Sequence, residues 1–178
     1  MTKLSQYGIS ADVRTGWEGR IYNRGDEPGA PPSPPNALSA SGSGSTGVGD
    51  AGTGGPVSTG RTNPILHLAN FALPMTIGDY GGAAVENMTN EHLFIAFVEF
   101  SPESAGTELF KATGMPKLRA DDFDPNCLQH ALPEQGGAQK FFTIDGRPFC
   151  LYVVLGSHRR RVRTVPVVND AVSGISIG

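Results

Sequence analysis

The sequence predicts an α+β domain: an antiparallel sheet with one C-terminal helix and one short helix packed on it, and a long disordered insert. Two apolar segments, residues 139–144 and 147–155, are joined by Asp145-Gly146, the strongest short signal for a β-hairpin. Residues 92–100 are apolar on both faces almost throughout, as expected of a buried strand. Hairpins combined with a helix near the C-terminus favour an antiparallel α+β fold over repeated βαβ units.

The insert is predicted from composition. The chain has 178 residues, about one domain, and its 24 glycines and 14 prolines are not spread evenly: residues 26–63 contain a proline cluster followed by Ser, Gly and Thr repeats. The only aliphatic residues beyond alanine in that segment are Leu38, Val48 and Val57. Such a segment cannot bury enough apolar surface to offset its ordering entropy. We therefore expect residues 26–63 to be disordered within a single domain spanning residues 1–178.

Period-two alternation predicts two strands before the insert. Residues 7–14 alternate apolar and polar side chains, Thr15-Gly16 supplies a turn, and residues 17–22 alternate again. The two segments form either a hairpin or two consecutive strands. After the insert, we expect a strand over residues 65–68 and a short helix over residues 83–88.

The C-terminal helix is predicted to begin at or next to Thr164 and to end at Gly174. Pro166 fits its first turn, where the missing N–H of proline costs nothing. A short last strand is expected over residues 175–177. The apolar side chains that follow Pro166 have the i, i+3, i+4 spacing of a helix face: Val168, Ala171 and Val172.

This order of elements, with Tyr7-Gly8-Ile9-Ser10 leading through a turn to Trp17, resembles the PsbP-like α+β proteins. The resemblance covers the first 17 residues and the element order, and Thr15 stands where that family usually has a proline. It implies a non-catalytic binding or assembly role. It carries no site residues across, because fold does not imply function.

Strands that are apolar on both faces need cover on both faces. The two predicted helices cover one face. The irregular segment 101–137 contains apolar side chains that could cover the other, and we favour this arrangement. A second copy of the chain or a different protein is the alternative, since large apolar patches mark interfaces. A protein partner or a homo-oligomer is therefore expected.

The densest charge feature is the run formed by Arg159, Arg160, Arg161 and Arg163, which we take as the candidate binding site. Such a run attracts phosphate, an acidic protein surface or nucleic acid. A solvated connection between two elements has the same composition. Nucleic acid is disfavoured because no aromatic side chain interleaves the arginines and the formal net charge is -3.

Cys127 and His130 carry the enzyme alternative. Three residues apart, they would share a helix face, and a thiol–imidazole pair can act as a nucleophile. Adding Cys150 and His158 gives a set of zinc-type ligands, but their spacing fits no usual pattern. Cys150 is explained more simply as a small buried hydrophobe.

Other polar residues give weaker signals. Asp122, Asp124 and Asn126 stand at alternate positions, like the start of a calcium loop, but Cys127 occupies the position that needs glycine. His67 is expected to be a surface or hydrogen-bonded histidine rather than a ligand. We therefore expect no metal and no cofactor.

The sequence lacks both an apolar run of the about 18 residues of a membrane helix and the apolar core of a signal peptide. We expect a cytoplasmic protein without a membrane span, in which Cys127 and Cys150 stay reduced. The leading hypothesis is a non-catalytic protein-binding or assembly module. Thiol chemistry at Cys127 and His130, and nucleic-acid or phosphate binding through the arginine run, are the alternatives.

Overall fold

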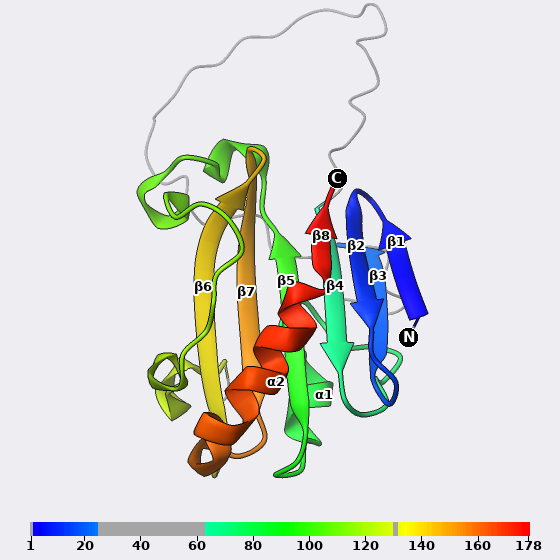
Figure 1. Cartoon of the computed structure of the whole chain (residues 1–178), viewed down its shortest axis with the longest axis vertical. Coiled ribbons are helices and arrows are strands. Elements are labelled where there is room, and N and C mark those ends of the chain that lie inside the picture. Colours follow the sequence, from blue (N-terminus) through cyan, green and yellow to red (C-terminus); the bar gives the residue numbers. More distant parts are fainter. Residues whose placement is uncertain (1, 25–62, 130–131) are drawn as a thin grey trace, which may run out of the picture.

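The computed structural model of the chain describes residues 2–24, 63–129 and 132–178 (Figure 1). The predicted disorder of residues 26–62 and the predicted role of His130 lie outside the described residues. Asn63, placed in the insert by composition, instead accepts a backbone hydrogen bond from Arg24 N at 3.4 Å. The residues that flank the insert on either side are therefore adjacent in the sheet, because Asn23 pairs with Pro64.

The described residues form two antiparallel sheets, and the predicted α+β class is confirmed. The larger sheet has the order β3 (Glu18–Asn23), β4 (Pro64–Ala69), β5 (Leu93–Glu99), β7 (Arg147–Leu155) and β6 (Gly136–Ile144). The smaller sheet has the order β1 (Thr2–Gln6), β2 (Ile9–Val13) and β8 (Ile175–Ile177).

The helices are α1 (Gly82–Glu86) and α2 (Arg161–Ser173). Short 3-10 turns lie between the strands and before α2: η1 (Pro102–Ser104), η2 (Glu108–Phe110), η3 (Ala120–Asp122), η4 (Pro125–Cys127) and η5 (His158–Arg160). None of the helices in the described part of the chain has the length and apolar composition needed to cross a membrane.

The predicted hairpin is confirmed. Asp145 and Gly146 have φ values of 49° and 76°, and the strands pair from Ile144 opposite Arg147 onward. Positive φ at both central positions is what an Asp-Gly turn supplies, and its twist matches that of the flanking strands.

The N-terminal segment differs from the prediction. Tyr7 lies in a turn with φ 53°, not in a strand, and β2 pairs with β1 and β8 rather than with β3. Period analysis missed β1 because its side chains are polar and exposed except for Leu4, which is half-buried. The alternative of two consecutive strands is therefore confirmed, and the hairpin between residues 7–14 and 17–22 is wrong.

The C-terminal helix begins one turn earlier than predicted. Thr164 is not its N-cap: the Thr164 hydroxyl donates back to the carbonyl of Arg160 at 3.1 Å, from inside the helix. Pro166 consequently lies in the helix interior. The buried face of α2, formed by Val165, Val168, Ala171 and Val172, supplies the packing that holds this longer helix.

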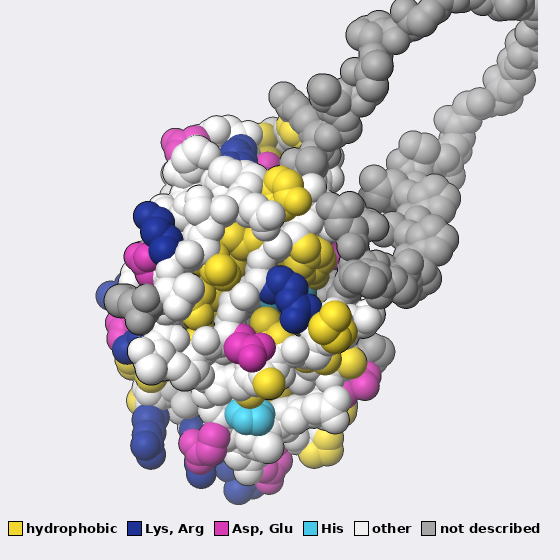
Figure 2. All heavy atoms as spheres, turned by 90° about the vertical axis from the view of Figure 1, so that its right-hand side faces the viewer, with side chains coloured by type: hydrophobic (Ala, Val, Ile, Leu, Met, Phe, Trp, Pro, Cys, Tyr) yellow, Lys and Arg dark blue, Asp and Glu magenta, His cyan; other side chains and the backbone are white. Residues whose placement is uncertain are grey.

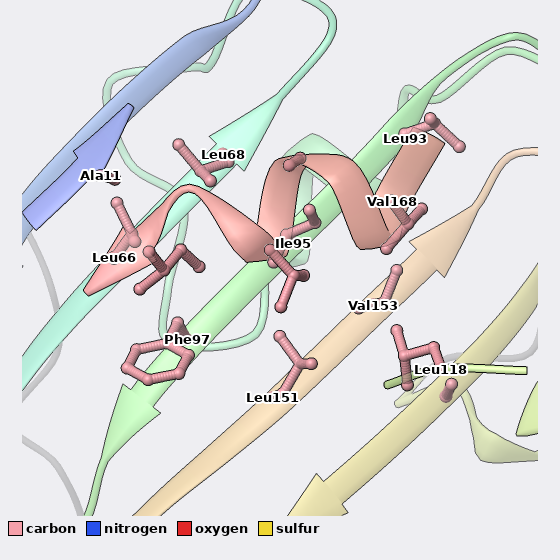
Figure 3. Packing of buried hydrophobic residues seen from close by; sticks show 14 of the residues in the cluster. Ala11, Leu66, Leu68, Leu93, Ile95, Phe97, Leu118, Leu151, Val153 and Val168 are labelled. Carbon is pink, nitrogen blue, oxygen red and sulfur yellow. The ribbon is translucent and has the colours of Figure 1, made fainter. Parts of the chain in front are cut away.

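The larger sheet has one apolar cluster on each face. On one face, α2 and the smaller sheet cover side chains such as Leu66, Ile95 and Leu151 (Figure 3). In Figure 1, α2 crosses in front of β5 and β7, while α1 lies behind the sheet, next to β5. The two opposite sides of β7, the Leu151 side and the Tyr152 side, belong to these two clusters.

The second face is covered mainly by α1 and the segment between β4 and α1, with Leu73, Ile77 and Val85 buried against it. The prediction that both helices cover one face is wrong, because α1 packs on this face and α2 on the other. The prediction that residues 101–137 cover the face opposite α2 is correct only in part. Leu128 and Leu132 do pack there, but Leu118 and Phe123 pack on the α2 side. The segment wraps the edge strand β6 through bridges to Thr143 and Gly137, so it contributes to both faces.

Candidate functional site

The predicted arginine run lies at the start of α2. Arg159 and Arg160 belong to η5, Arg161 is the first residue of α2, and Arg163 lies in its first turn. The run therefore spans the connection between β7 and α2 and the first turn of α2. Figure 2 shows several Lys and Arg side chains, with Asp and Glu side chains among them, at the lower end of the molecule, the end at which α2 begins in Figure 1.

The four arginines are not equivalent. Arg160 forms an ion pair with Glu91, and Arg161 donates to the carbonyl of His158 at 3.2 Å. Arg159 and Arg163 are exposed, and neither forms an ion pair with any other residue that the structure describes. Arg159 lies in the turn that leads into α2, and Arg163 lies in the first turn of α2. The structure therefore distinguishes two exposed cations without a described ion-pair partner from the two arginines that are already engaged.

Apolar side chains accompany these cations. Val162 is 73% exposed and Val167 is 37% exposed, and Pro166 is exposed between them. Helical spacing puts these residues opposite the buried face of α2, where a helix of a globular protein ordinarily carries polar side chains. We call this surface the α2 outer face, defined by Arg159, Val162, Arg163, Pro166 and Val167.

The charges on this face oppose the helix dipole. Cations near the positive N-terminal end of a helix are unfavourable by about 0.3–1 kcal/mol each. No acidic residue in the first turn of α2 offsets them. Because both the helix end and the guanidinium groups of Arg159 and Arg163 are positive, the α2 outer face attracts carboxylate groups.

The two cysteines differ in their exposure to solvent. Cys127 is exposed in η4, whereas Cys150 is buried in β7. Burial raises the pKa of the Cys150 thiol to about 11, although Gln139 Nε2 donates a hydrogen bond to its Sγ at 3.4 Å. Cys150 therefore stays a neutral thiol, as expected of a buried hydrophobe.

The acidic segment serves local structure. Asp124 accepts hydrogen bonds from the backbone and side chain of Asn126 at 2.7 and 2.8 Å. Asp122 accepts from Lys140 Nζ at 2.5 Å and from the backbone N–H of Arg119 at 2.7 Å. Within the described ranges, no group of three or more His, Cys, Asp or Glu side chains could hold a metal ion.

His67 is fully buried in the middle of β4, so the surface alternative for it is wrong and the hydrogen-bonded one is confirmed. Its Nε2 lies 3.0 Å from the carbonyl oxygen of Asp79. The hydroxyl of Tyr22 lies 3.4 Å from the same nitrogen. The ring of Phe94 packs against the imidazole, with the two ring centroids 5.1 Å apart. His67 thus connects the segment that contains Asp79 to the larger sheet through a hydrogen bond.

Sequence inspection missed a pocket on the face opposite α2. Its volume is about 210 Å³, and it lies between residues 77–86 and the Tyr152 side of β7. Ile77, Val85 and the rings of Tyr80 and Tyr152 form apolar walls, and Glu86 lies at the wall as well. The walls come from segments that are distant in sequence, so no local motif marks them.

Comparisons of the chain with protein families, with curated proteins and with solved structures find no match. The candidate sites therefore rest on geometry and charge alone.

Proposed function

We propose that this protein is a non-catalytic binding module that docks an acidic segment of a partner protein on the α2 outer face. The observation that supports this most directly is the pairing of two uncompensated cations, Arg159 and Arg163, with exposed Val162 and Val167.

The composition of the α2 outer face suits a protein interface. Apolar surface supplies the driving force for association, at about 25 cal/mol per Å² removed from water. Arginine is enriched among residues that contribute most to binding, and complementary charge raises the rate of encounter. Val162, 73% exposed, gains from burial only when a partner covers it.

An acidic partner fits the face better than a second copy of the chain. Along the same side of α2 the only carboxylate is Asp170, which already lies 3.6 Å from Arg14 in an exposed ion pair. A second copy would therefore offer one carboxylate against two unpaired arginines. A partner segment with two or more Asp or Glu side chains beside an aliphatic residue matches the face.

The two alternatives have less support. Nucleic acid would find phosphate-binding cations on the α2 outer face but no aromatic ring on which a base could stack. For thiol chemistry, Cys127 is exposed, and the structure describes no general base for it because His130 lies outside the described residues.

The test is site-specific photocrosslinking in native extract. A benzophenone amino acid replaces Val167, and captured proteins are identified by mass spectrometry. Three forms are compared: the otherwise wild-type chain, Arg159→Ser/Arg163→Ser, and the matched control Arg160→Ser/Arg161→Ser, which removes the same charge. We expect capture of an acidic, aliphatic segment that falls at least tenfold in the first double variant and at most threefold in the control.

Equal capture by both double variants would overturn the proposal, because the two arginine pairs would then be equivalent. Crosslinks only to the chain itself would replace the partner by a homo-oligomer. Crosslinks to RNA, with affinity that falls steeply as salt rises, would replace it by nucleic-acid binding.

A further inference from the structure

The pocket between residues 77–86 and β7 is the strongest feature that the proposed function leaves unexplained. It lies on the face of the larger sheet opposite α2, so it is separate from the α2 outer face. Its volume of about 210 Å³ is below the about 300–1,000 Å³ of pockets that hold drug-sized ligands. Its occupant is therefore a small group.

Two tyrosine rings form much of the apolar wall of the pocket. The rings of Tyr80 and Tyr152 meet edge to face, with centroids 5.4 Å apart and planes at 87°. The hydroxyl oxygen of Tyr152 accepts a hydrogen bond from the backbone N–H of Gln129 at 3.2 Å. The hydroxyl of Tyr80 has no hydrogen-bond partner among the residues that the structure describes. A phenol oxygen in an apolar wall is thus available to a ligand.

The phenol of Tyr80 stays neutral. Burial, followed by the nearby Cys150 thiol, raises its pKa to about 12, and the Arg24 guanidinium lowers the pKa only in part. A neutral phenol oxygen can accept a hydrogen bond from an ammonium group. The pKa therefore does not oppose a cation at this position.

The charge at the pocket selects the ligand class. Asp79 is held by Arg24, whose Nε lies 2.8 Å from the Asp79 carboxylate, so this pair is neutral. Glu86 is exposed on α1 and forms no ion pair with another described residue. Among the described residues of the pocket, Glu86 therefore leaves one uncompensated negative charge beside two aromatic rings, and ring faces also attract cations.

We propose that this pocket binds a small organic cation, with its apolar group between Tyr80, Tyr152 and Val85 and its ammonium group beside Glu86. The apolar walls exclude a strongly hydrated ion, and the charge of Glu86 disfavours an anion of the same size. A ring or a short branched chain carrying one ammonium group meets both conditions.

The test is a methyl-detected NMR titration with 2-phenylethylammonium, read on the methyl signals of Ile77 and Val85. Its matched competitor is 3-phenylpropanoate, which has the same ring and a chain of similar length with the opposite charge. We expect saturable shifts of these methyl signals with the ammonium compound and an affinity at least fivefold lower for the carboxylate. Equal affinity of the two compounds, or shifts confined to other methyl groups, would overturn the proposal.

Variants distinguish the contribution of the Glu86 charge to binding from that of the apolar pocket walls. Glu86→Gln should weaken binding of 2-phenylethylammonium about fivefold, as expected for a solvent-exposed ion pair. The control Glu108→Gln, in η2 away from the pocket, should leave binding unchanged. Leu132→Trp, at the partly exposed rim, should reduce binding at least tenfold by filling the pocket while the chain stays folded. Unchanged affinity in both Glu86→Gln and Leu132→Trp would show that the compound binds elsewhere.

Discussion

Replacing Arg147 by methionine removes a polar link between the two sheets and should destabilise the fold strongly. Arg147 opens β7, and its Nε and Nη2 donate to the two carboxylate oxygens of Glu99 in β5 at 2.9 and 2.6 Å. The same guanidinium donates to the carbonyls of Gly8 and Tyr7 at 3.1 Å each. Those carbonyls belong to the turn between β1 and β2, so one side chain connects the larger sheet to the smaller one.

The cost follows from burial. Breaking a buried ion pair by removing one partner costs about 3–5 kcal/mol, because the remaining charge is left uncompensated. The side chain of Glu99 is 9% exposed and that of Arg147 is 25% exposed, so water screens part of the interaction. We therefore expect Arg147→Met to lower the free energy of unfolding by about 2–3 kcal/mol.

Urea unfolding followed by the fluorescence of Trp17 measures this change, since Trp17 is the only tryptophan and packs against the core. Glu99→Leu/Arg147→Met should be less destabilised than the sum of the two single variants by about 2 kcal/mol, because no charge is left unpaired. Arg147→Lys is the control that keeps the positive charge and loses the bidentate hydrogen bonds to the Glu99 carboxylate. A loss below about 0.5 kcal/mol for Arg147→Met, or strictly additive effects, would refute this account.

Three further predictions concern single positions. Gly156→Ala should lower the free energy of unfolding by roughly 3 kcal/mol, because its Cβ would lie 1.8 Å from the carbonyl oxygen of Thr89; an unchanged melting temperature would contradict this. Burial raises the pKa of Tyr80 to about 12 from an unfolded value of about 10. Stability that is complete below pH 10 should therefore fall as the pH rises toward 12, and Tyr80→Phe should flatten that decline in urea midpoints. A thiol reagent at neutral pH should label only Cys127 in the folded chain and both thiols in urea; fast labelling of Cys150 would show that β7 opens.

Much of the fold was predictable because local chemistry and tertiary structure agree. The Asp145-Gly146 turn, the apolar strand β5 and the helix end at Gly174 each follow from a few neighbouring residues. The binding candidates were predictable only as a run of arginines. Which of them are free depends on Glu91 and on the carbonyl of His158, and contact between Glu91 and Arg160 is set by tertiary packing.

The sequence by itself determined the class of the fold, its two-faced apolar strands and its C-terminal helix, because periodicity and turn chemistry act over a few residues. Tertiary structure decided the rest. It placed polar β1 in a sheet, extended α2 back to Arg161, and assembled a pocket from Tyr80 and Tyr152. These features depend on contacts between segments far apart in the chain, and such contacts leave no local pattern in the residues that make them.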